Sequence, residues 1–211
     1  MSVVVAVKYK DGVAIAADKQ ATRYNTNFNN VCKLHNFKYS NSAIGTVGYL
    51  RDCNVIRLLE EVIQYKDIID NVYIDELYVI GKIVPIIQEH MTKYERIETQ
   101  NELKYMPSTM LYATSDDIYM IERDFAVITE DNYGTIGCGE EKVIGYMSLV
   151  GDTTNYNKEQ ITTVLIEAIT RACERDVFIN NNIDITFLEK TEINNDESYS
   201  VKGGLRNNIL N

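Results

Sequence analysis

Two short apolar runs separated by a turn signal constrain the fold more than any other feature. The first run is Val3–Val7, and after Lys10-Asp11-Gly12 the chain resumes as Val13–Ala17 and stops at Asp18. An Asp-Gly pair between two apolar runs is typical of a β-hairpin, because glycine tolerates a positive φ angle. Continuous apolar runs of this length indicate strands that are covered on both faces. The sequence therefore predicts a hairpin of two buried strands.

The length of the hairpin loop decides where Asp18 lies. In a three-residue loop with Gly12 left-handed, Tyr9 pairs with Val13, and Asp18 falls opposite Val4 on the same face as Ser2. A two-residue turn places Asp18 on the other face, because a shift of one residue reverses the side chains.

Three reactive side chains can meet at one end of the predicted hairpin: Ser2, Asp18 and Lys33, the last at the end of the stretch 29–33. If Met1 is removed, the α-amine of Ser2, with an ordinary pKa of about 8, can take the proton of its own hydroxyl at neutral pH. Lys33 would lower the pKa of that amine, and Asp18 would keep the lysine charged and oriented. The alternative is a disordered serine terminus, an aspartate in a strand-end turn and a solvated lysine, which spacing alone favours.

A family resemblance adds to this pattern. The residues that carry it are SVVVAVKYKDGVAIAADKQATRYNT, starting at Ser2, and NNVCKL, which contains Lys33. They resemble the start of a proteasome β-type or HslV-like peptidase, where a nucleophilic threonine, a DG hairpin, an aspartate followed by QAT, and an NVxK segment occur in this order. The similarity extends over most of residues 2–190. It implies that Ser2 is the nucleophile and that Asp18 and Lys33 support it.

The same resemblance implies further site residues. The glycine that binds the oxyanion falls in 43–48, and we assign it to Gly45; a serine near the N-terminal amine corresponds to Cys138 of Gly137-Cys138-Gly139; and an aspartate of the family corresponds to Asp176. No cofactor is required for the chemistry. A structural monovalent or divalent cation is implied on three backbone carbonyls, those of Cys173, Asp176 and Ile179.

Three positions depart from the family pattern. Ser2 stands in place of threonine and lacks the methyl group that fixes the threonine rotamer, which predicts a less well-organised nucleophile. Val3 replaces a usual threonine, and Ile179 replaces a hydroxyl residue and has no hydrogen-bond donor on its side chain. The sequence therefore supports an active peptidase, or alternatively a catalytically silent, ring-forming scaffold subunit. An amidase acting on a small molecule is a third possibility.

Composition limits the other function classes. The chain has 211 residues, 45% of them hydrophobic, which fits one domain over residues 1–192 followed by a polar tail at 193–211. A net charge of -10 with only 21 Lys and Arg argues against a nucleic-acid partner. The sequence has no apolar stretch near the roughly 18 residues of a membrane span. Its four cysteines form no CxxC pair and follow no secretory signal, so we expect a reduced, cytoplasmic protein without zinc.

The remaining periodicity predicts the order of the elements. Apolar residues recur at helical spacing over 50–63 and over about 73–92, where Gly81 and Pro85 imply a kink. An exposed connection is expected over 92–105. Strands are expected at 43–47, 108–113, 118–121, 126–129 and 183–188. Helices are expected from the 134–139 segment to about 149, and from a capping box at Asn157 and Gln160 to near Asp176.

The resemblance implies how these elements assemble. The expected fold is α+β, a four-layer αββα sandwich of two stacked antiparallel sheets flanked by helices. Relatives form rings of six or seven copies, often double, which receive unfolded protein or peptide chains from a ring ATPase. These partners are expectations from the resemblance, and the sequence itself does not state the ring size.

Overall fold

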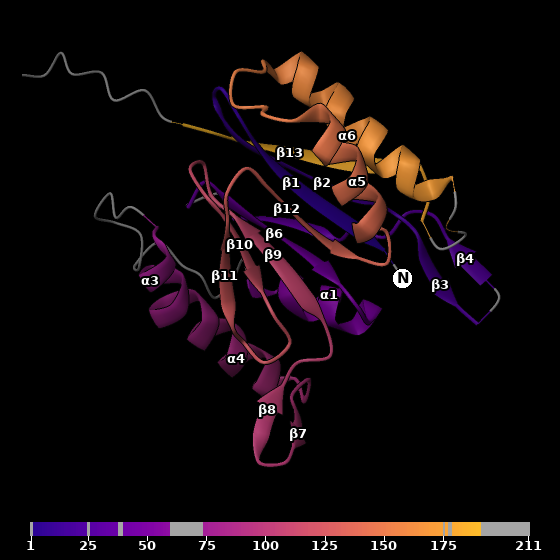
Figure 1. Ribbon diagram of the computed structural model, residues 1–211. Helices are drawn as coiled ribbons and strands as arrows, with labels where there is room; N and C mark the ends of the chain where they lie inside the picture. The colour runs from indigo at the N-terminus through magenta and orange to yellow at the C-terminus, as the bar shows by residue number, and fades with distance from the viewer. Residues whose placement is uncertain are drawn as a thin grey trace, which may run out of the picture.

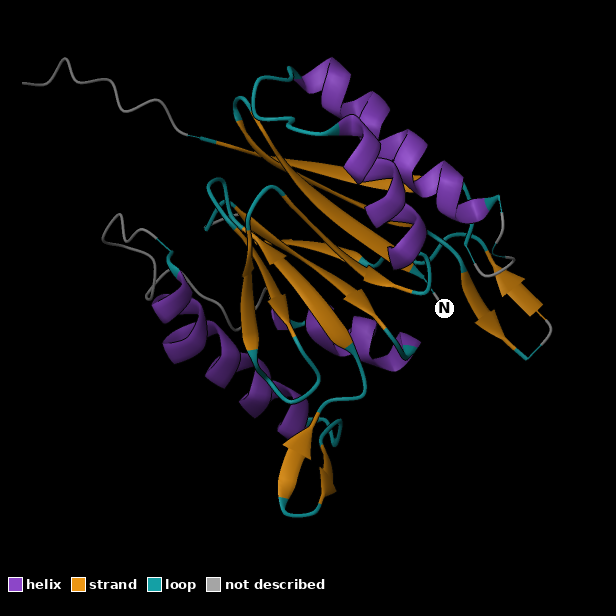
Figure 2. Ribbon diagram, viewed as in Figure 1, coloured by secondary structure: helices purple, strands orange, loops and turns teal. Residues whose placement is uncertain are grey.

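The computed structural model describes residues 2–24, 26–37, 40–59, 74–174, 176 and 179–190. Two antiparallel sheets stack face to face, and helices cover the outer face of each (Figures 1 and 2). This arrangement is the predicted αββα sandwich. The inner face of each sheet is covered by the other sheet, and its outer face is covered by helices.

The first sheet has the order β12-β1-β2-β13. Its strands are β12 (Tyr133–Gly137), β1 (Val3–Tyr9), β2 (Gly12–Asp18) and β13 (Ile183–Glu189). Every residue of β2 and all but one of β1 are buried, because these two strands are central in the sheet and covered on both sides. The predicted buried hairpin is confirmed.

The register of this hairpin differs from the three-residue alternative. Tyr9 pairs with Gly12 and Val4 pairs with Ala17, so the turn consists of Lys10 and Asp11 alone. Gly12 has a φ of +152°, and a Cβ there would lie 2.0 Å from the carbonyl oxygen of Leu188. Glycine is therefore required by the close approach of β13, and the two-residue register is the one that forms.

The second sheet has the order β11-β10-β9-β6-β5. Its strands are β11 (Val127–Glu130), β10 (Ile118–Ile121), β9 (Thr109–Ala113), β6 (Ser42–Val47) and β5 (Leu34–Phe37). Four of these match predicted strands to within one residue at each end. The fifth, β5, directly follows Lys33 and was not predicted, because LHNF lacks a continuous apolar run.

Residues alternate between two cores along β1. Val4 and Ala6 face the other sheet and pack in a core shared with Leu34, Ala43 and Leu111. Val3, Val5 and Val7 face the opposite way and pack under the helices of the first sheet. The period of two along an extended strand explains why a wholly apolar run suits this position.

Helices α5 (Glu140–Val150) and α6 (Lys158–Cys173) cover the first sheet (Figure 1). The predicted capping box at the start of α6 is confirmed: Gln160 N–H donates to Asn157 Oδ1 at 3.0 Å, and Asn157 N–H donates to Gln160 Oε1 at 2.9 Å. The segment 134–139 leads into α5 as expected, since the helix begins at Glu140 with Gly139 as its N-cap. The first part of this segment belongs to strand β12, which pairs with β1 at the edge of the sheet.

The second sheet is covered by α1 (Leu50–Arg57) and by a continuous helical segment made of α3 (Glu76–Tyr78), the π-helical η2 (Val79–Ile83) and α4 (Val84–Lys93). Where a kink was predicted, the structure has a π-helical turn, η2, which contains Gly81 and ends two residues before Pro85, a residue with no N–H to donate. The predicted ends of the two helices, beyond residue 59 and before residue 74, lie outside the described residues.

Two small hairpins project from the sandwich. One is β3 (Ala21–Arg23) with β4 (Thr26–Phe28), beside the N-terminal end of β1 (Figure 1). The other is β7 (Glu98–Gln100) with β8 (Leu103–Tyr105). The connection over 92–105 is thus exposed as expected but contains a hairpin, whose turn residues Asn101 and Glu102 have φ angles of 51° and 69°.

Two expectations concern the ends and the surface of the chain. The polar tail expected at 193–211 lies outside the described residues. Among the helices that are described, none is long and apolar enough to span a membrane.

Candidate active site

Ser2 lies directly before β1 and is 6% exposed. Its carbonyl oxygen accepts a hydrogen bond from the backbone N–H of Cys138 at 2.9 Å, and the Cys138 thiol lies 3.4 Å from the same oxygen. Gly137 has a φ of +109°, and a Cβ there would lie 2.1 Å from that carbonyl oxygen. The Gly137-Cys138-Gly139 segment therefore holds the backbone of Ser2, and glycine at 137 makes the close approach possible.

Asp18, at the end of β2, is completely buried and accepts three hydrogen bonds. Its Oδ1 accepts from Lys33 Nζ at 2.7 Å and from the backbone N–H of Val3 at 2.9 Å. Its Oδ2 accepts from the backbone N–H of Gln20 at 3.0 Å. These bonds compensate the cost of burying a carboxylate, and they bind it to the residue next to Ser2.

Lys33 precedes β5 and is 3% exposed. Burial lowers the pKa of its ammonium group, and the neighbouring Asp18 carboxylate partly opposes that effect. The backbone of Lys33 is fixed as well, because its carbonyl oxygen accepts from Thr46 N–H at 3.1 Å. A desolvated cation is thus held at the N-terminal end of β1.

Two cavities border Ser2. A small one of about 60 Å³ is lined by Ser2, Lys33, Gly48 and Cys53 among others. A larger one of about 350 Å³ is lined by Ser2, Gly48, Tyr49, Pro107 and Cys138 among others. Ser2 therefore borders space on two sides, and Gly48 borders both cavities.

The oxyanion assignment to Gly45 requires a correction. Gly45 lies within β6, paired with Leu34 and Leu111, and a Cβ there would lie 2.4 Å from Val4 Cγ1 in the core between the sheets. Neither cavity beside Ser2 is lined by Gly45, whereas both are lined by Gly48. The available signal was the position of Gly48, at the junction where the predicted strand ended and the next helix was expected to begin.

A second flank of Ser2 is formed by Cys138, by Asp176 that is hydrogen-bonded to it, and by Ile179 beside the neighbouring Gly139. Desolvation of the thiol, followed by a hydrogen bond to Asp176, raises the pKa of Cys138 to about 11, so the thiol is neutral at pH 7. Ile179 is 4% exposed, and its Cδ1 would lie 2.8 Å from a Cβ placed on Gly139. This flank of Ser2 therefore presents a neutral thiol and an apolar side chain.

The carbonyl groups predicted to hold a cation follow the end of α6. The Cys173 carbonyl accepts a backbone hydrogen bond from Asp176 at 3.3 Å, and the Asp176 carbonyl accepts one from Ile179 at 3.2 Å. The geometry is that of consecutive turns and gives no independent support for a cation, so the cation stays a prediction. Among the described residues, no group of three or more His, Cys, Asp or Glu side chains has metal-binding geometry.

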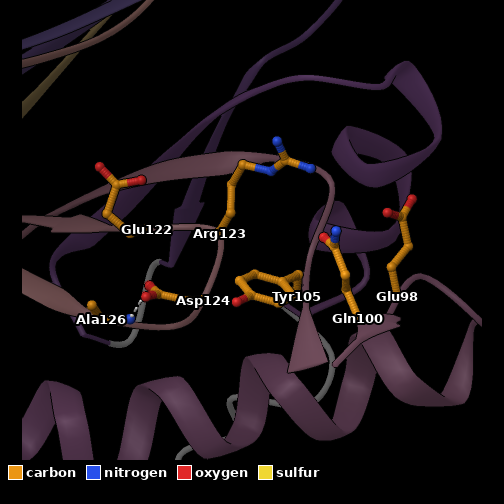
Figure 3. A pocket seen from close by; sticks show the side chains of 7 residues that line it. All are labelled: Glu98, Gln100, Tyr105, Glu122, Arg123, Asp124 and Ala126. Atoms are coloured by element: carbon orange, nitrogen blue, oxygen red, sulfur yellow. Dashed lines mark hydrogen bonds between the residues drawn. The ribbon is translucent and has the colours of Figure 1, made fainter. Parts of the chain in front are cut away.

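A third cavity of about 440 Å³ lies away from Ser2, between the β7–β8 hairpin and the β10–β11 turn (Figure 3). It is lined by Glu98, Gln100, Tyr105, Glu122, Arg123, Asp124 and Ala126. This lining has no serine, cysteine or lysine nucleophile, so we place the candidate site at Ser2 despite the larger volume here.

The structure thus brings together four predicted residues, Ser2, Asp18, Lys33 and Cys138, with Asp176 beside Cys138. Sequence reasoning did not select Gly48 within the stretch 43–48 and did not place Cys53 at the site. Cys53 lines the small cavity from α1, and burial raises its pKa to about 11, so it is a neutral thiol there.

Comparisons with known proteins identify the fold and the family of the chain. A solved structure of eukaryotic HslV from Trypanosoma brucei is similar to this chain with a TM-score of 0.59 and 21% identity, covering 89% of this chain and 99% of the HslV chain. At this identity the likeness shows the fold alone. A search of curated proteins found no match. The sequence model of the family described as "Proteasome subunit" matches residues 2–188, and the chain therefore belongs to the proteasome subunit family.

Proposed function

We propose that this protein is an N-terminal nucleophile peptidase in which Ser2, after removal of Met1, attacks peptide bonds. The observation that carries the proposal is the buried Lys33–Asp18 ion pair, which borders the Ser2 cavity. A buried charge pair costs desolvation energy and is weak evidence of stability. Its position beside a candidate nucleophile favours a role in catalysis.

The α-amine of Ser2 acts as the general base. It needs to be unprotonated near neutral pH, and a nearby ammonium group lowers the pKa of an amine by repulsion. Lys33 supplies that charge. Asp18 keeps Lys33 oriented and also binds Val3 N–H, which fixes the chain one residue from the nucleophile.

Hydrolysis then takes two steps. The Ser2 Oγ forms a bond to the substrate carbonyl carbon while the amine takes its proton, and the peptide C–N bond breaks as that proton passes to the leaving nitrogen. Gly48 N–H is our candidate donor to the oxyanion, in place of Gly45, because Gly48 borders both cavities at Ser2. Water, deprotonated by the same amine, then attacks the ester carbonyl carbon; the bond to Ser2 Oγ breaks, the acid product leaves, and the amine returns the proton to Oγ.

Assembly and partners follow from family membership as proposals. We propose a self-assembled ring of six or seven copies, possibly double, whose chamber encloses the Ser2 sites. The substrates are unfolded proteins or peptides, and a ring ATPase is the proposed supplier. Enclosure would protect other proteins from a nucleophile of low intrinsic selectivity.

A second candidate function is a catalytically silent scaffold subunit of such a ring. Ile179 favours it, because this buried apolar side chain stands where the family resemblance places a hydroxyl group near the amine. A silent subunit retains the fold and the assembly and hydrolyses nothing.

The test compares untagged wild-type protein with Ser2→Ala. Intact mass spectrometry should show loss of Met1, light scattering should give a mass many times 24.1 kDa, and peptide hydrolysis should disappear in the variant while the assembly persists. Retained Met1, an acetylated Ser2, or equal hydrolysis by both proteins would contradict the peptidase proposal. A ring without any hydrolysis would favour the scaffold.

A further inference from the structure

A buried polar network lies behind Gly48. Asp52, in the first turn of α1, is completely buried, and its Oδ2 accepts a hydrogen bond from Ser108 Oγ at 2.5 Å. Its Oδ1 accepts a hydrogen bond from Arg96 Nε. Three segments far apart in sequence therefore meet at one carboxylate.

The network is in direct contact with Gly48. A Cβ on Gly48 would lie 2.2 Å from Ser108 Oγ and 2.8 Å from Ser108 Cβ, so the two residues pack closely. Gly48 has a φ of +137°, a conformation that glycine adopts more readily than other residues. The hydroxyl of Ser108 is thus bound to Asp52 on one side and supports Gly48 on the other.

Asp52 also fixes the residue after Gly48. Its backbone N–H donates to the carbonyl oxygen of Tyr49 at 2.9 Å, which starts α1 there. The guanidinium carbon of Arg96 lies 5.8 Å from the centroid of the Tyr49 ring, within range of a cation–π contact. Both ends of the Gly48–Tyr49 peptide are therefore adjacent to the same network.

The end of α4 directs Arg96 toward this network. Arg96 N–H donates to Met91 O at 2.8 Å, and Glu95 N–H donates to Thr92 O at 3.0 Å, which is the hydrogen-bond pattern of a Schellman motif. Glu95 has a φ of +56°, the left-handed conformation that this motif requires. The helix end therefore fixes the backbone from which Arg96 extends.

We infer that Arg96, Asp52 and Ser108 are positioning residues that hold the backbone of Gly48 so that its N–H points to the oxyanion formed on attack by Ser2. This inference rests on the proposed peptidase function and on Gly48 as the oxyanion donor. The three side chains act through Gly48 and do not contact substrate. A displacement of about 1 Å at such a donor can reduce the rate about 100-fold.

The experiment measures kcat and KM of the assembled full-length protein and three variants on a fluorogenic peptide. Ser108→Ala and Arg96→Met should each lower kcat about 10-fold with KM within about twofold of wild type, because an oxyanion donor acts in the transition state. Arg96→Lys should return kcat to within about threefold of wild type, since it restores a donor cation. Arg171→Met is the matched control: Arg171 forms an exposed ion pair with Glu174 at the end of α6, away from Asp52, and kcat should not change.

A second readout separates positioning from general damage. Periodate oxidises a free N-terminal serine and needs no oxyanion donor, so its rate at Ser2, followed by peptide mass mapping, should equal the wild-type rate in each variant. Unchanged kcat in both Ser108→Ala and Arg96→Met, or a fall in kcat matched by a changed periodate rate, would overturn the inference while leaving the peptidase intact. Wild-type protein without hydrolysis would overturn both.

Discussion

The two flanks of Ser2 differ in the kind of group that they place beside it. On one flank, Asp18 accepts three hydrogen bonds and Lys33 is buried against it. On the other, Ile179 packs against Gly139, and Cys138 offers only a neutral thiol. Lys33 and Asp18, which would set the pKa of the amine, are thus held by hydrogen bonds. Cys138 and Ile179, which would orient the amine, are a weak donor and an apolar side chain. The difference predicts that catalysis depends strongly on the first flank and can be improved at the second.

The largest effect is expected for Lys33→Met. It removes the cation that lowers the pKa of the amine, and peptide hydrolysis should fall about 1000-fold, within the range for general base catalysis. Asp18 keeps its two backbone donors, so the assembly should persist. The control is Lys158→Met, whose exposed ion pair with Glu189 lies outside the site. Equal losses in the two variants would show that the comparison of flanks is wrong.

Gly137→Ala should have the next largest effect. Its Cβ would lie 2.1 Å from the Ser2 carbonyl oxygen at a φ of +109°, so we expect a loss of about 1–3 kcal/mol in stability and, because Ser2 must move, about 100-fold in kcat. Gly145→Ala is the matched control, since nothing lies within 4 Å of its Cβ and a helical alanine should add about 0.5–1 kcal/mol. Denaturant unfolding and steady-state kinetics measure both. Unchanged kcat in Gly137→Ala would mean that the position of Ser2 is not critical.

Asp18→Asn should change the pH dependence of the residual activity. Burial already lowers the pKa of Lys33 below its ordinary value of 10.5, and Asp18 raises it. Without Asp18 the pKa falls further, so Lys33 loses its charge at lower pH. The alkaline limb of the pH–rate profile should therefore lie at lower pH in the variant than in wild type. If the alkaline limb of the variant lies at the same pH as that of wild type, or at higher pH, Lys33 is not the group that titrates.

The smallest effects are expected from substitutions that restore the residue types of the family pattern at Ser2 and Ile179. Ser2→Thr adds the methyl group that restricts the nucleophile rotamer, and kcat should rise about threefold. Combining it with Ile179→Ser supplies a hydroxyl and should raise kcat further, although the cavity left by isoleucine will cost about 2–5 kcal/mol in stability. Ile179→Ala, which makes the cavity without the hydroxyl, is the control. No gain from any of these changes would favour the silent scaffold.

Much of the fold could be predicted because the decisive signals are local. The apolar runs at Val3–Val7 and Val13–Ala17, and the capping box at Asn157, each indicate their structure within a few residues. Strand β12 was missed because Tyr133–Gly137 contains two glycines and forms a strand through its pairing with β1. The hairpin register was left open because Gly12 is required by Leu188, a contact distant in sequence.

In the candidate site, too, the residues with local sequence signals were predicted, and those that depend on contacts distant in sequence were not. Ser2, Asp18 and Lys33 follow from a resemblance of consecutive residues, and the structure places them together. Gly45 and Gly48 are three residues apart in one stretch, and only the pairing of the sheets shows that Gly45 faces Val4 while Gly48 lies beside Ser2. The network of Asp52, Arg96 and Ser108 joins three distant segments, so no local pattern in the sequence indicates it.

The most direct test of the central claim is covalent labelling of wild-type protein with a peptide epoxyketone, which reacts with a hydroxyl and a neighbouring free amine together. Peptide mapping should find one equivalent of the inhibitor on Ser2, with Met1 absent and no labelling in Ser2→Ala. Unlabelled Ser2 in a fully assembled protein, or retained Met1, would contradict the claim that Ser2 is an N-terminal nucleophile.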